Sequence, residues 1–442
     1  MKLIKIFVVF FCLLGTAFAE APKFIAQGVY AYPDRIIIGD SEEVREKDWP
    51  VFFEEMSEFF DGLEVRVWGT SYLPSYDPSL LIRFIKKAHE YGVGVAINFW
   101  EYPNSRNMPL QYQAKKLDRD GKIVPTELSD DYAFNPLLDK CNAAAVKWQA
   151  EQIKAFLQMI VKEEPIDYFM FTEDRLSAWD AKTPWPHQVN YWQGGTYSKA
   201  AASSWGKYSQ GHKLPVDNQK LVNQYTEYTD EESELWYKFW EWRFRIFANY
   251  INEILKAAHG VAAPVSQSFE TIIMEWQRVY DEGIFSVNGD WPIADNAVFG
   301  VSAFWLSKMP YLDHFIVEYG EDGINNAAWQ KANKKGTDQI ASVVKGNNKA
   351  IGGFIQAYSW PLHKATPQMI EGEYNMSLEA GAKVIVVYDC AVLYSGNSRY
   401  SEEAVAEWQR VIPPKESIKP NGEIEAPPEF EEGDEEEEIV EE

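Results

Sequence analysis

Short apolar runs alternate with amphipathic stretches along most of the chain. The apolar runs are rich in Val, Ile, Phe and Tyr, as buried strands are, whereas apolar residues recur every three to four positions between them, as in helices. The pattern predicts strands over residues 24–32, 63–68, 93–100, 166–172, 261–269, 314–317, 351–358 and 383–388. It predicts helices over residues 42–60, 78–91, 135–162, 231–258, 294–308, 325–344, 367–380 and 402–410.

Strands that alternate with helices pair in parallel, because each crossover returns the chain to the same end of the sheet. Eight such units match a closed (β/α)8 barrel, the TIM-barrel architecture, better than an open doubly wound sheet. A dinucleotide-binding sheet would need a glycine-rich phosphate turn after strand one, and the residues around Gly28 supply none. No short repeat of fixed period occurs, which excludes a solenoid. We therefore predict an α/β barrel with a long, aromatic-rich insertion after strand four, at about residues 178–229.

The start of the chain differs from its body. Lys2 and Lys5 precede and flank an apolar run over residues 6–14, and Ala17-Phe18-Ala19 forms a small-x-small cleavage pattern. These features predict a signal peptide over residues 1–19 and a secreted or periplasmic protein. The apolar run is short for a span of about 20 residues, and no later segment is long and apolar enough, so we expect no membrane span in the mature protein.

The charge is concentrated at the other end. The chain has a formal net charge of −25, and residues 423–442 are almost all acidic, with few apolar side chains. Such a segment cannot bury enough surface to fold, so residues 416–442 are predicted to be a disordered acidic tail and residues 20–415 the barrel domain. Phosphate binding needs clustered positive charge, which the body also lacks, so nucleic acid is not an expected partner.

The sequence offers little for metal, redox or nucleotide chemistry. Its His residues are scattered singly, and no paired-Cys spacing, GxSxG elbow or phosphate-binding loop occurs. We therefore expect no metal and no cofactor. Cys141 and Cys390 lie far apart in the chain, and the sequence leaves open whether they pair.

In a barrel of this kind, the active site lies at the carboxyl ends of the strands, whatever the chemistry. Polar and aromatic residues that end otherwise apolar strands are therefore the candidates for function. They are Arg66, Trp68, Asn98, Glu101, Glu173, Asp174, Glu270, Glu318, Gln356, Trp360 and Asp389. Carboxylates and aromatics dominate this set, and it contains no histidine.

Glu173 is the leading catalytic candidate. It follows the apolar run 166–172 directly and is itself followed by Asp174. Glycoside hydrolysis needs one protonated carboxyl as an acid and a second, ionised one as nucleophile or base. A Glu at the rim of an apolar barrel, beside another acid, should have a raised pKa, as an acid requires. The alternative is that Glu173 or Asp174 simply forms an ion pair with Arg175.

Glu318 is the expected partner of Glu173, because it too ends an apolar strand, and Gly320 then breaks the strand. The alternative is that Glu318 orients Arg66 or bonds to Tyr319. Glu270, expected to end strand five, is the reserve candidate for the second carboxylate. The remaining candidates are expected to bind substrate hydroxyls or sugar faces rather than to react, and they include Arg66, Trp68, Asn98, Glu101, Asp174, Trp360 and Asp389.

Four short motifs resemble the clan A glycoside hydrolases, family 5 among them. The run 65–68 is similar to their second-strand arginine motif, and the run 171–173 to their fourth-strand Asn-Glu acid/base. The run 317–320 resembles their nucleophile strand, and the segment 352–360 resembles their eighth strand, whose Trp floors a sugar subsite. The resemblance implies a TIM barrel that cleaves glycosidic bonds, with Glu173 as acid/base and Glu318 as nucleophile.

The chain departs from that pattern in two places. Thr172 stands where the clan has the Asn that contacts the sugar 2-hydroxyl. The strand count also places Glu318 on strand six, whereas the clan has its nucleophile on strand seven. Either residues 296–305 form a strand and residues 383–389 are an addition, or the chain is a different kind of barrel.

Aromatic residues supply a second argument, since they make up 15% of the chain. Sugar rings present apolar faces that stack on indole rings. Trp185, Trp192 and Trp205 lie in the polar insertion after strand four and are predicted to wall a cleft. The aromatics of the helix at 231–258 have helical spacing and are predicted to pack in the core. Two functions remain open: a glycoside hydrolase with a poly- or oligosaccharide substrate, or a catalytically inactive carbohydrate-binding barrel.

Overall fold

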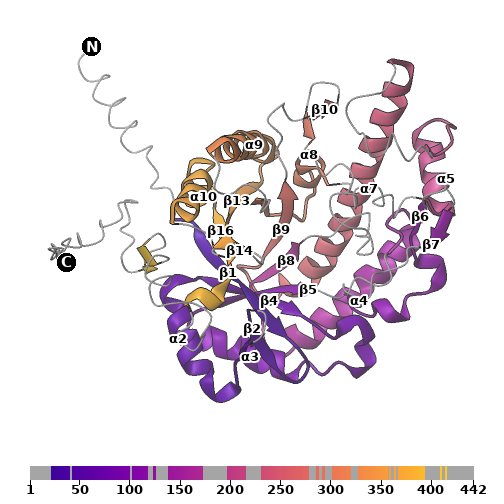
Figure 1. Ribbon diagram of the computed structural model, residues 1–442. Coiled ribbons are helices and arrows are strands. Elements are labelled where there is room, and N and C mark those ends of the chain that lie inside the picture. Colours follow the sequence, from indigo (N-terminus) through magenta and orange to yellow (C-terminus); the bar gives the residue numbers. More distant parts are fainter. Residues whose placement is uncertain are drawn as a thin grey trace, which may run out of the picture.

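The computed structural model describes residues 21–39, 42–99, 102–117, 123–125, 138–172, 197–215, 230–277, 285–287, 291–293, 301–319, 327–356, 358–359, 363–364, 367–393, 409–410 and 414–415. Eight parallel strands form a closed barrel at its centre (Figure 1). In barrel order they are β1 (Lys23–Ala31), β4 (Gly62–Val67), β5 (Gly94–Phe99), β8 (Tyr168–Thr172), β9 (Glu270–Gln277), β12 (His314–Tyr319), β13 (Ala350–Gln356) and β16 (Val384–Tyr388). Parallel pairing of β16 with β1, which sets Lys23 opposite Val384, closes the barrel. The predicted (β/α)8 barrel is confirmed.

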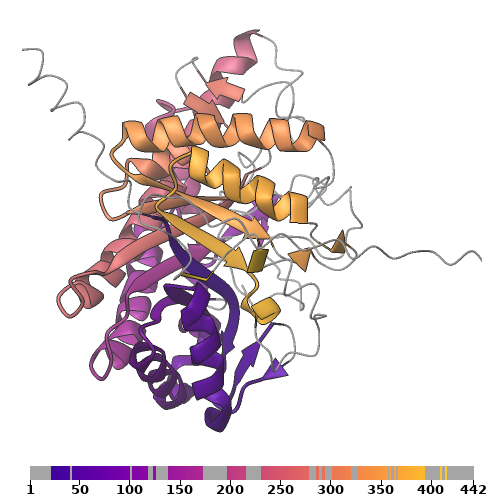
Figure 2. The same cartoon turned by 90° about the vertical axis from the view of Figure 1, so that its left-hand side faces the viewer.

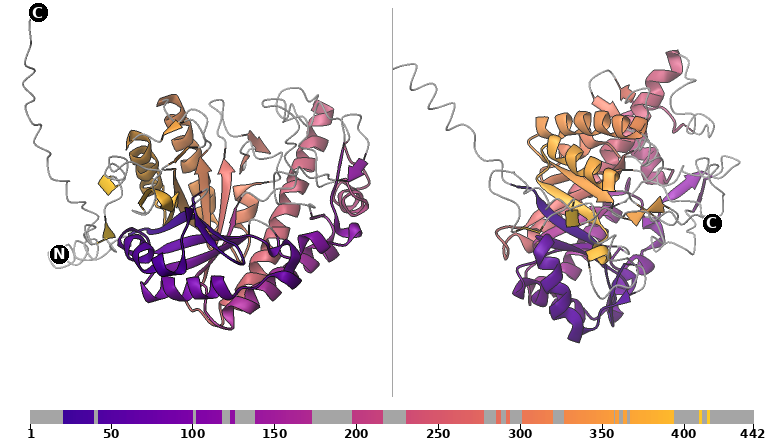
Figure 3. Two further views of the ribbon diagram at one scale, coloured as in Figure 1. Left: turned by 60° about the horizontal axis from the view of Figure 1, so that its bottom comes forward. Right: turned by 60° about the vertical axis from the view of Figure 1, so that its left-hand side comes forward.

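Helices surround the strands. They are α2 (Trp49–Phe59), α3 (Ser79–Glu90), α4 (Ala143–Val161), α7 (Asp230–Ala262), α8 (Ala303–Ser307), α9 (Ala327–Gly346) and α10 (Pro367–Glu379), with α5 (Lys199–Tyr208) further out in the insertion. Figure 2 shows α9 and α10 side by side outside β13, and Figure 3 shows α4 beside α7 on another side of the barrel. The strands therefore form a buried inner layer, and the helices shield them from solvent.

Shorter elements decorate this frame. Strands β2 (Ile36–Ile38) and β3 (Glu42–Glu43) extend β1 in antiparallel fashion. Three small hairpins lie outside the barrel sheet and consist of β6 (Lys115–Leu117) with β7 (Ile123–Pro125), β10 (Phe285–Val287) with β11 (Trp291–Ile293), and β14 (Tyr358–Ser359) with β15 (His363–Lys364). The short 3-10 helices are η1 (Glu46–Asp48), η2 (Thr70–Ser75), η3 (Ser105–Asn107), η4 (Leu110–Tyr112) and η7 (Cys390–Leu393).

Helix α3 shows why the amphipathic pattern predicted the first half of the fold well. Its buried residues are Leu81, Phe84, Ile85 and Ala88, at the spacing of one helical face. The chain leaves the helix through Gly92, whose φ of +72° lies in the left-handed region that glycine adopts without steric cost. The helix and its glycine stop therefore agree with the prediction to within one residue at each end.

The helix predicted over 42–60 begins later than expected. Residues Glu42–Glu43 form β3 instead, and α2 starts at Trp49. Pro50 explains the start, because its missing N–H and fixed φ are tolerated only in the first turn of a helix. Helix α4 also begins later than predicted, where the Asn142 side chain accepts hydrogen bonds from two backbone N–H groups of the first turn.

The prediction of strand five at 261–269 is wrong. Helix α7 continues through Gly260 to Ala262, and β9 begins only at Glu270. A glycine inside a helix costs about 1 kcal/mol relative to alanine, which does not end a helix that packs well beyond it. Val261 and Ala262 are both buried, and their packing keeps the last turn helical. Glu270, which had been placed at the end of strand five, therefore lies at the start of that strand.

Two apolar clusters stabilise the fold. The larger one lies inside the barrel and between its strands and helices. The smaller one joins the insertion to α7 and contains Tyr197, Ala201, Trp205, Phe239, Trp240, Trp242 and Phe244. The predicted core role is confirmed for Phe239, Trp240, Trp242, Phe244 and Phe247, which are all buried. The side chains of Trp236 and Tyr237 lie outside the described part of the helix.

Two further questions from the sequence have structural answers. Cys141 and Cys390 are both free thiols, so they do not pair with each other. Within the described ranges, no helix is both long enough and apolar enough to cross a membrane.

Candidate active site

A chain of hydrogen bonds lies inside the barrel, toward the carboxyl ends of strands two to four. Arg66 Nε donates to both carboxylate oxygens of Glu64, at 3.0 and 3.3 Å. The Asn98 side-chain amide donates to Glu64 Oε1 and also to Thr172 Oγ1, the latter over 2.7 Å. All four side chains are buried. The carboxyl ends of the strands are where this fold places its active sites, so this cluster is the frame of the candidate site.

The strand geometry brings these four residues together. Alternation along β4 puts Glu64 and Arg66 on one face of the strand, because side chains two residues apart point the same way. In the parallel register Arg66 lies opposite Asn98 of β5, and Asn98 lies opposite Met170 of β8. Thr172 is the last residue of β8, so the cluster ends immediately before Glu173 in the chain.

The ionic pair at the centre of this cluster is deeply buried. The Glu64 side chain is fully buried, and the Arg66 side chain is 6% exposed. Removing two charges from water is costly unless they pair closely and their remaining hydrogen-bonding groups are satisfied. The guanidinium of Arg66 also lies 5.9 Å from the centre of the Tyr30 ring, a distance at which the ring attracts a cation.

Asp389 borders the same region from the end of β16. Its side chain is buried, and Oδ1 accepts a hydrogen bond of 2.6 Å from the backbone N–H of Ala391. A Cβ on Gly28 would come within 3.0 Å of the Asp389 Cβ, and Gly28 has a φ of +103°. Glycine at this position therefore lets Asp389 pack over β1. Burial, then the charges of Asp389 and Glu64, raise the pKa of the neighbouring Cys390 thiol.

Trp68 follows β4 and is partly exposed at the same end of the barrel. Its ring stacks on Tyr32, with ring centres 5.7 Å apart and planes within 14° of each other. The Arg35 guanidinium lies 4.7 Å from the centre of the same Tyr32 ring, so Tyr32 is held between a cation and an indole. Because Tyr32 covers one face of Trp68, at most the other face is available to stack on a sugar.

The structure describes only part of the predicted site. Arg66, Trp68, Asn98 and Asp389 lie at the expected end of the barrel, and Asn98 meets Arg66 through Glu64. The main chain of Glu318 lies in β12 opposite Trp276, whereas its side chain is outside the described part. Six predicted site residues fall entirely outside the described ranges, namely Glu101, Glu173, Asp174, Trp185, Trp192 and Trp360.

Glu270 does not lie at the carboxyl face, so its predicted role is wrong. It is the first residue of β9, at the amino end of the barrel, because the true strand five begins nine residues later than predicted. It forms ion pairs with Lys23 at 3.2 Å and with His314 at 3.3 Å. The hydrogen bond to His314 and the nearby positive charges outweigh burial and lower the pKa of Glu270 to about 2. Glu270 therefore stabilises the opposite end of the barrel.

The role predicted for Trp205 is also wrong. The side chain is fully buried, and its Nε1 donates a hydrogen bond of 2.9 Å to the backbone oxygen of Lys213. Its ring makes edge contacts with Phe239 and Trp242 of α7, with ring centres 5.5 Å away in each case. Trp205 therefore anchors the insertion to the barrel and offers no free face to a sugar.

Sequence analysis missed two buried carboxylates of the barrel strands, Glu64 and Glu275. Glu64 stands two residues before Arg66 in an otherwise apolar strand, and that spacing was a usable signal because it puts opposite charges on one face. Glu275 is 1% exposed and lies in β9 opposite Val317. It was overlooked because strand five was predicted to end before it.

The order of strands in the barrel also shows which strand carries Glu318. Glu318 lies on the sixth barrel strand, and Val384–Tyr388 is the eighth. Between β9 and β12, the only strands among the described residues are those of the hairpin β10–β11, which is separate from the barrel. The seventh strand, β13, ends at Gln356 and not at a carboxylate. The clan A pattern has its nucleophile on strand seven. In this chain strand seven is β13, and it does not end in an acid.

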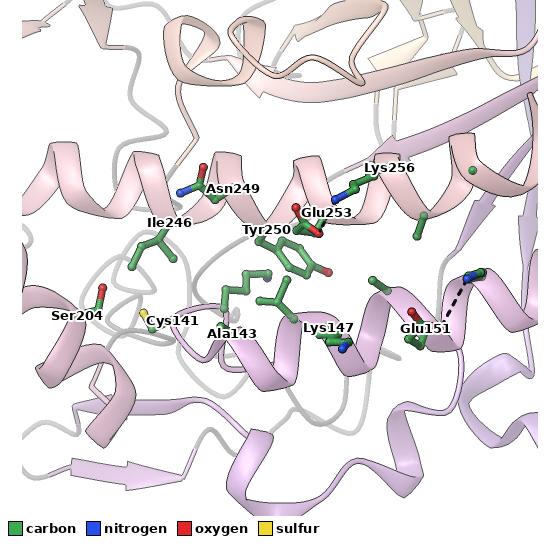
Figure 4. Close-up of a pocket in the computed structure, with 16 residues that line it drawn as sticks. Cys141, Ala143, Lys147, Glu151, Ser204, Ile246, Asn249, Tyr250, Glu253 and Lys256 are labelled. Carbon is green, nitrogen blue, oxygen red and sulfur yellow. Dashed lines mark ion pairs between the residues drawn. The ribbon is translucent and has the colours of Figure 1, made fainter.

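A separate cavity of about 680 Å³ lies on the outer wall of the barrel, between α4 and α7 (Figure 4). Lys147 and Glu253 are among the residues around it, with Tyr250 between the two helices. Two ion pairs lie along it, Lys154 with Glu151 at 3.9 Å and Lys256 with Glu253 at 3.8 Å. It is bounded by helices rather than by strand ends, so it is distinct from the candidate site. Over the described part of the chain, no group of three or more His, Cys, Asp or Glu side chains could hold a metal ion.

The fold and the cluster define a (β/α)8 barrel with a buried polar network at its carboxyl end, and solved structures share this architecture. The catalytic domain of β-amylase from Paenibacillus polymyxa aligns with a TM-score of 0.53 at 13% identity, over 89% of this chain and 99% of that one. The β-galactosidase from Halorubrum lacusprofundi aligns with a TM-score of 0.50 at 10% identity, over 87% of this chain and 57% of that one. Identities this low show the shared fold. No protein-family model and no curated protein matches the sequence.

Proposed function

We propose that this protein hydrolyses O-glycosidic bonds of a poly- or oligosaccharide, with Glu173 as the general acid. The observation that carries the proposal is the buried network from Arg66 through Glu64 and Asn98 to Thr172, which ends one residue before Glu173. A preorganised polar frame beside a strand-end carboxyl is what this fold uses to position reacting groups. The likeness in fold to a β-amylase and a β-galactosidase supports the same class of reaction.

Glu318 is the proposed second carboxylate. It is the fifth of six residues in β12, and so lies close to the carboxyl end of the strand. Strand seven ends in Gln356, which makes strand six the better-supported source of the second acid. A retaining enzyme needs the two carboxyl groups about 5 to 5.5 Å apart, and an inverting enzyme about 6.5 to 9.5 Å. The anomeric configuration of the first product, followed by NMR, would therefore report the separation.

The substrate-binding part of the proposal uses the other strand-end residues. Arg66 and Asn98 hold the frame, while Asp389 and Trp68 border it. Glu101, Asp174 and Trp360 are proposed to bind hydroxyls or a sugar face. Trp185 and Trp192 of the insertion are proposed to stack on more distant sugar units, since carbohydrate faces pack on indole rings.

A catalytically inactive carbohydrate-binding barrel is the second candidate. It is favoured by one observation, the absence of a carboxylate at the end of β13, where the clan A pattern has its nucleophile. The two candidates predict the same binding but opposite turnover.

We also propose that the protein is exported. The apolar run after Lys5 and the Ala17-Phe18-Ala19 cleavage pattern support removal of a signal peptide and a secreted or periplasmic location. Amino-terminal sequencing of protein recovered from the producing cells tests this, because export predicts a mature chain that starts at Glu20.

The test of the main proposal is a screen of the purified mature protein against chromogenic glycosides and polysaccharides, with Glu173→Gln as the matched control. Turnover that depends on Glu173 supports the hydrolase. Oligosaccharide binding measured by calorimetry, without turnover of any substrate, supports the binding barrel. If neither binding nor turnover occurs, both candidates are wrong.

A further inference from the structure

Three planar side chains, Trp68, Tyr32 and Arg35, form a stack at the carboxyl end of the first two barrel strands, the rim stack. The Trp68 and Tyr32 ring centres are 5.7 Å apart, and the Arg35 guanidinium lies 4.7 Å from the centre of the Tyr32 ring. The main chain fixes this arrangement. The Trp68 N–H donates to the Ala31 oxygen over 2.8 Å, and the Tyr32 N–H donates to the Arg35 oxygen over 2.9 Å. A short turn therefore holds all three planar groups in place.

Alternation along the strands determines the direction in which the rim stack points. In the parallel register Tyr30 lies opposite Arg66, and the Arg66 guanidinium is 5.9 Å from the centre of the Tyr30 ring. Side chains two residues apart on a strand share a face. Tyr32 and Trp68 each follow two residues later, and their stacked rings show that they still share a side. The rim stack therefore extends the face of the buried Arg66 network toward the mouth of the barrel.

The Arg35 guanidinium keeps its hydrogen-bonding capacity. A guanidinium has five N–H donors in one plane. Within the ranges that the structure describes, none of them donates a hydrogen bond, and the single carboxylate in ion-pair range is that of Asp34, with 3.7 Å between Nη1 and Oδ2. That contact is too long for a hydrogen bond, and the Arg35 and Asp34 side chains are 45% and 74% exposed. Stacking on Tyr32 occupies a face of the guanidinium and leaves its edge available.

We propose that Arg35 binds the carboxylate of an acidic sugar, so that the site prefers a glycan that contains uronic acid units. The inference rests on the proposed glycosidase function and adds a substrate class to it. A stacked guanidinium presents two parallel N–H groups along its edge, at the spacing of the two oxygens of a carboxylate. Only the Tyr32 ring separates Arg35 from Trp68, so a glycan that passes Trp68 also passes Arg35.

The net charge of the protein does not exclude an anionic substrate. Much of the formal charge of −25 lies in residues 423–442, and exposed charges more than about 8 Å apart are largely screened at physiological ionic strength. The charges next to the proposed contact therefore decide its strength. Beside the Arg35 cation lies the Asp34 anion, which competes with a substrate carboxylate for the same guanidinium. Removal of Asp34 should consequently strengthen the contact that removal of Arg35 abolishes.

The first experiment uses the best oligosaccharide found for the wild type and a set of derivatives in which the hydroxymethyl group of one sugar unit is oxidised to a carboxylate. With the carboxylate at one position, kcat/KM of the wild type should rise about tenfold, the worth of one charge-assisted hydrogen bond at a partly exposed site. In Arg35→Gln this preference should disappear, with cleavage of the neutral parent unchanged. Arg83→Gln is the matched control, because Arg83 pairs with Glu46 at an exposed position of α3.

The second experiment tests the competition by Asp34. In Asp34→Asn the preference for the acidic derivative should increase about two- to fivefold over the wild type, because an exposed ion pair of this kind is worth little more. Arg35→Lys keeps the charge but not the two parallel donors, so it should retain only part of the preference. A purely structural role of the rim stack would change cleavage of the acidic and neutral forms equally and would leave the preference as it is.

Three outcomes would overturn the inference. The first is equal cleavage of the neutral parent and every acidic derivative by the wild type. The second is a preference that Arg35→Gln leaves intact. The third is an Arg35-dependent preference that appears only with sulfate esters of the same oligosaccharide, which would assign the site to sulfated sugars. If the wild type cleaves none of these glycans, the proposed hydrolase fails, and the same comparison of Kd values by calorimetry decides the inference for a binding barrel.

Discussion

Two ionic clusters lie at opposite ends of the same barrel, and they differ in how deeply their charges are buried. In the amino-end cluster, Glu270 pairs with both Lys23 and His314, and the Lys23 and Glu270 side chains are 42% and 32% exposed. In the carboxyl-end cluster, the Arg66 and Glu64 side chains are 6% and 0% exposed, and the network continues through Asn98 to Thr172. The first cluster is therefore partly in contact with solvent, whereas the second is buried inside the barrel.

The comparison shows that a shifted pKa alone does not locate an active site. The pKa of Glu270 is lowered to about 2, and yet Glu270 lies at the end of the barrel that contributes to stability. Perturbed carboxylates occur in structural ion pairs as well as in catalytic sites. What separates the two clusters is their position along the strands and the depth at which their charges are buried.

The largest expected effect comes from removing the central carboxylate of the carboxyl-end cluster, Glu64. Glu64→Ala leaves the buried Arg66 guanidinium without its carboxylate, and removal of one partner of a buried pair costs about 3 to 5 kcal/mol. Urea denaturation measures this loss in the free energy of unfolding. Glu90→Ala is the matched control, because Glu90 pairs with Lys87 on the surface and should contribute less than about 1 kcal/mol. Similar losses in the two variants would mean that the Glu64–Arg66 pair is not structurally important.

The buried carboxylate of Asp139 sharpens the comparison, because its pKa shifts in the opposite direction to that of Glu270. Burial raises the pKa of Asp139 from 3.8 to about 6, although hydrogen bonds from Ser198 and the Cys141 backbone oppose the shift. The folded protein therefore binds this proton more tightly than the unfolded chain. The resulting stability is fully present below pH 3.8 and is lost as the pH rises through about 6.

Asp139→Asn removes that titration and should be more stable than the wild type at pH 8, by at most about 3 kcal/mol. The difference should shrink between pH 6 and pH 4. Unfolding curves in urea at pH 4.5, 6 and 8 measure it. A constant difference at all three pH values would show that Asp139 titrates normally in the folded protein.

The smallest expected effect comes from the amino-end cluster. Its partners lower the pKa of Glu270 from 4.5 to about 2, so Glu270 stabilises the fold above pH 4.5, and that contribution is lost as the pH falls toward 2. Because the Glu270 side chain is 32% exposed, solvent screening limits the loss in Glu270→Gln at pH 7 to about 1 to 2 kcal/mol. Activity should stay within about threefold of the wild type. A variant that lost most of its activity while keeping its stability would place chemistry at the amino end of the barrel.

Periodicity predicted the elements whose local signals agree with their packing. In α3 the apolar stripe and the glycine stop coincide with the buried face and the end of the helix. At α7 the local signal and the packing disagree, since Gly260 indicates a stop while Val261 and Ala262 are buried in a continuing helix. Tertiary packing decides such conflicts, and a single sequence does not contain it.

The sequence predicted which residues of the site lie at strand ends, but it did not predict which side chains they contact. Arg66 and Asn98 were identified because they interrupt or follow apolar runs, whereas the role of Glu64 depends on register, which sets Arg66 opposite Asn98. Trp205 shows the reverse problem. Its polar neighbours in the sequence suggested a binding wall, yet α7 covers it completely.

The central claim is that a strand-end acid next to the carboxyl-end cluster protonates a leaving group, and the most direct measurement varies that leaving group. Glu173→Gln should lose about 10²- to 10⁴-fold in kcat on an unactivated oligosaccharide, the usual worth of general acid catalysis. On the matching dinitrophenyl glycoside, whose leaving group needs no proton, the bond-cleavage step should be nearly unchanged. A loss of the same size on both substrates, or activity within a few-fold of the wild type on the oligosaccharide, would contradict the account.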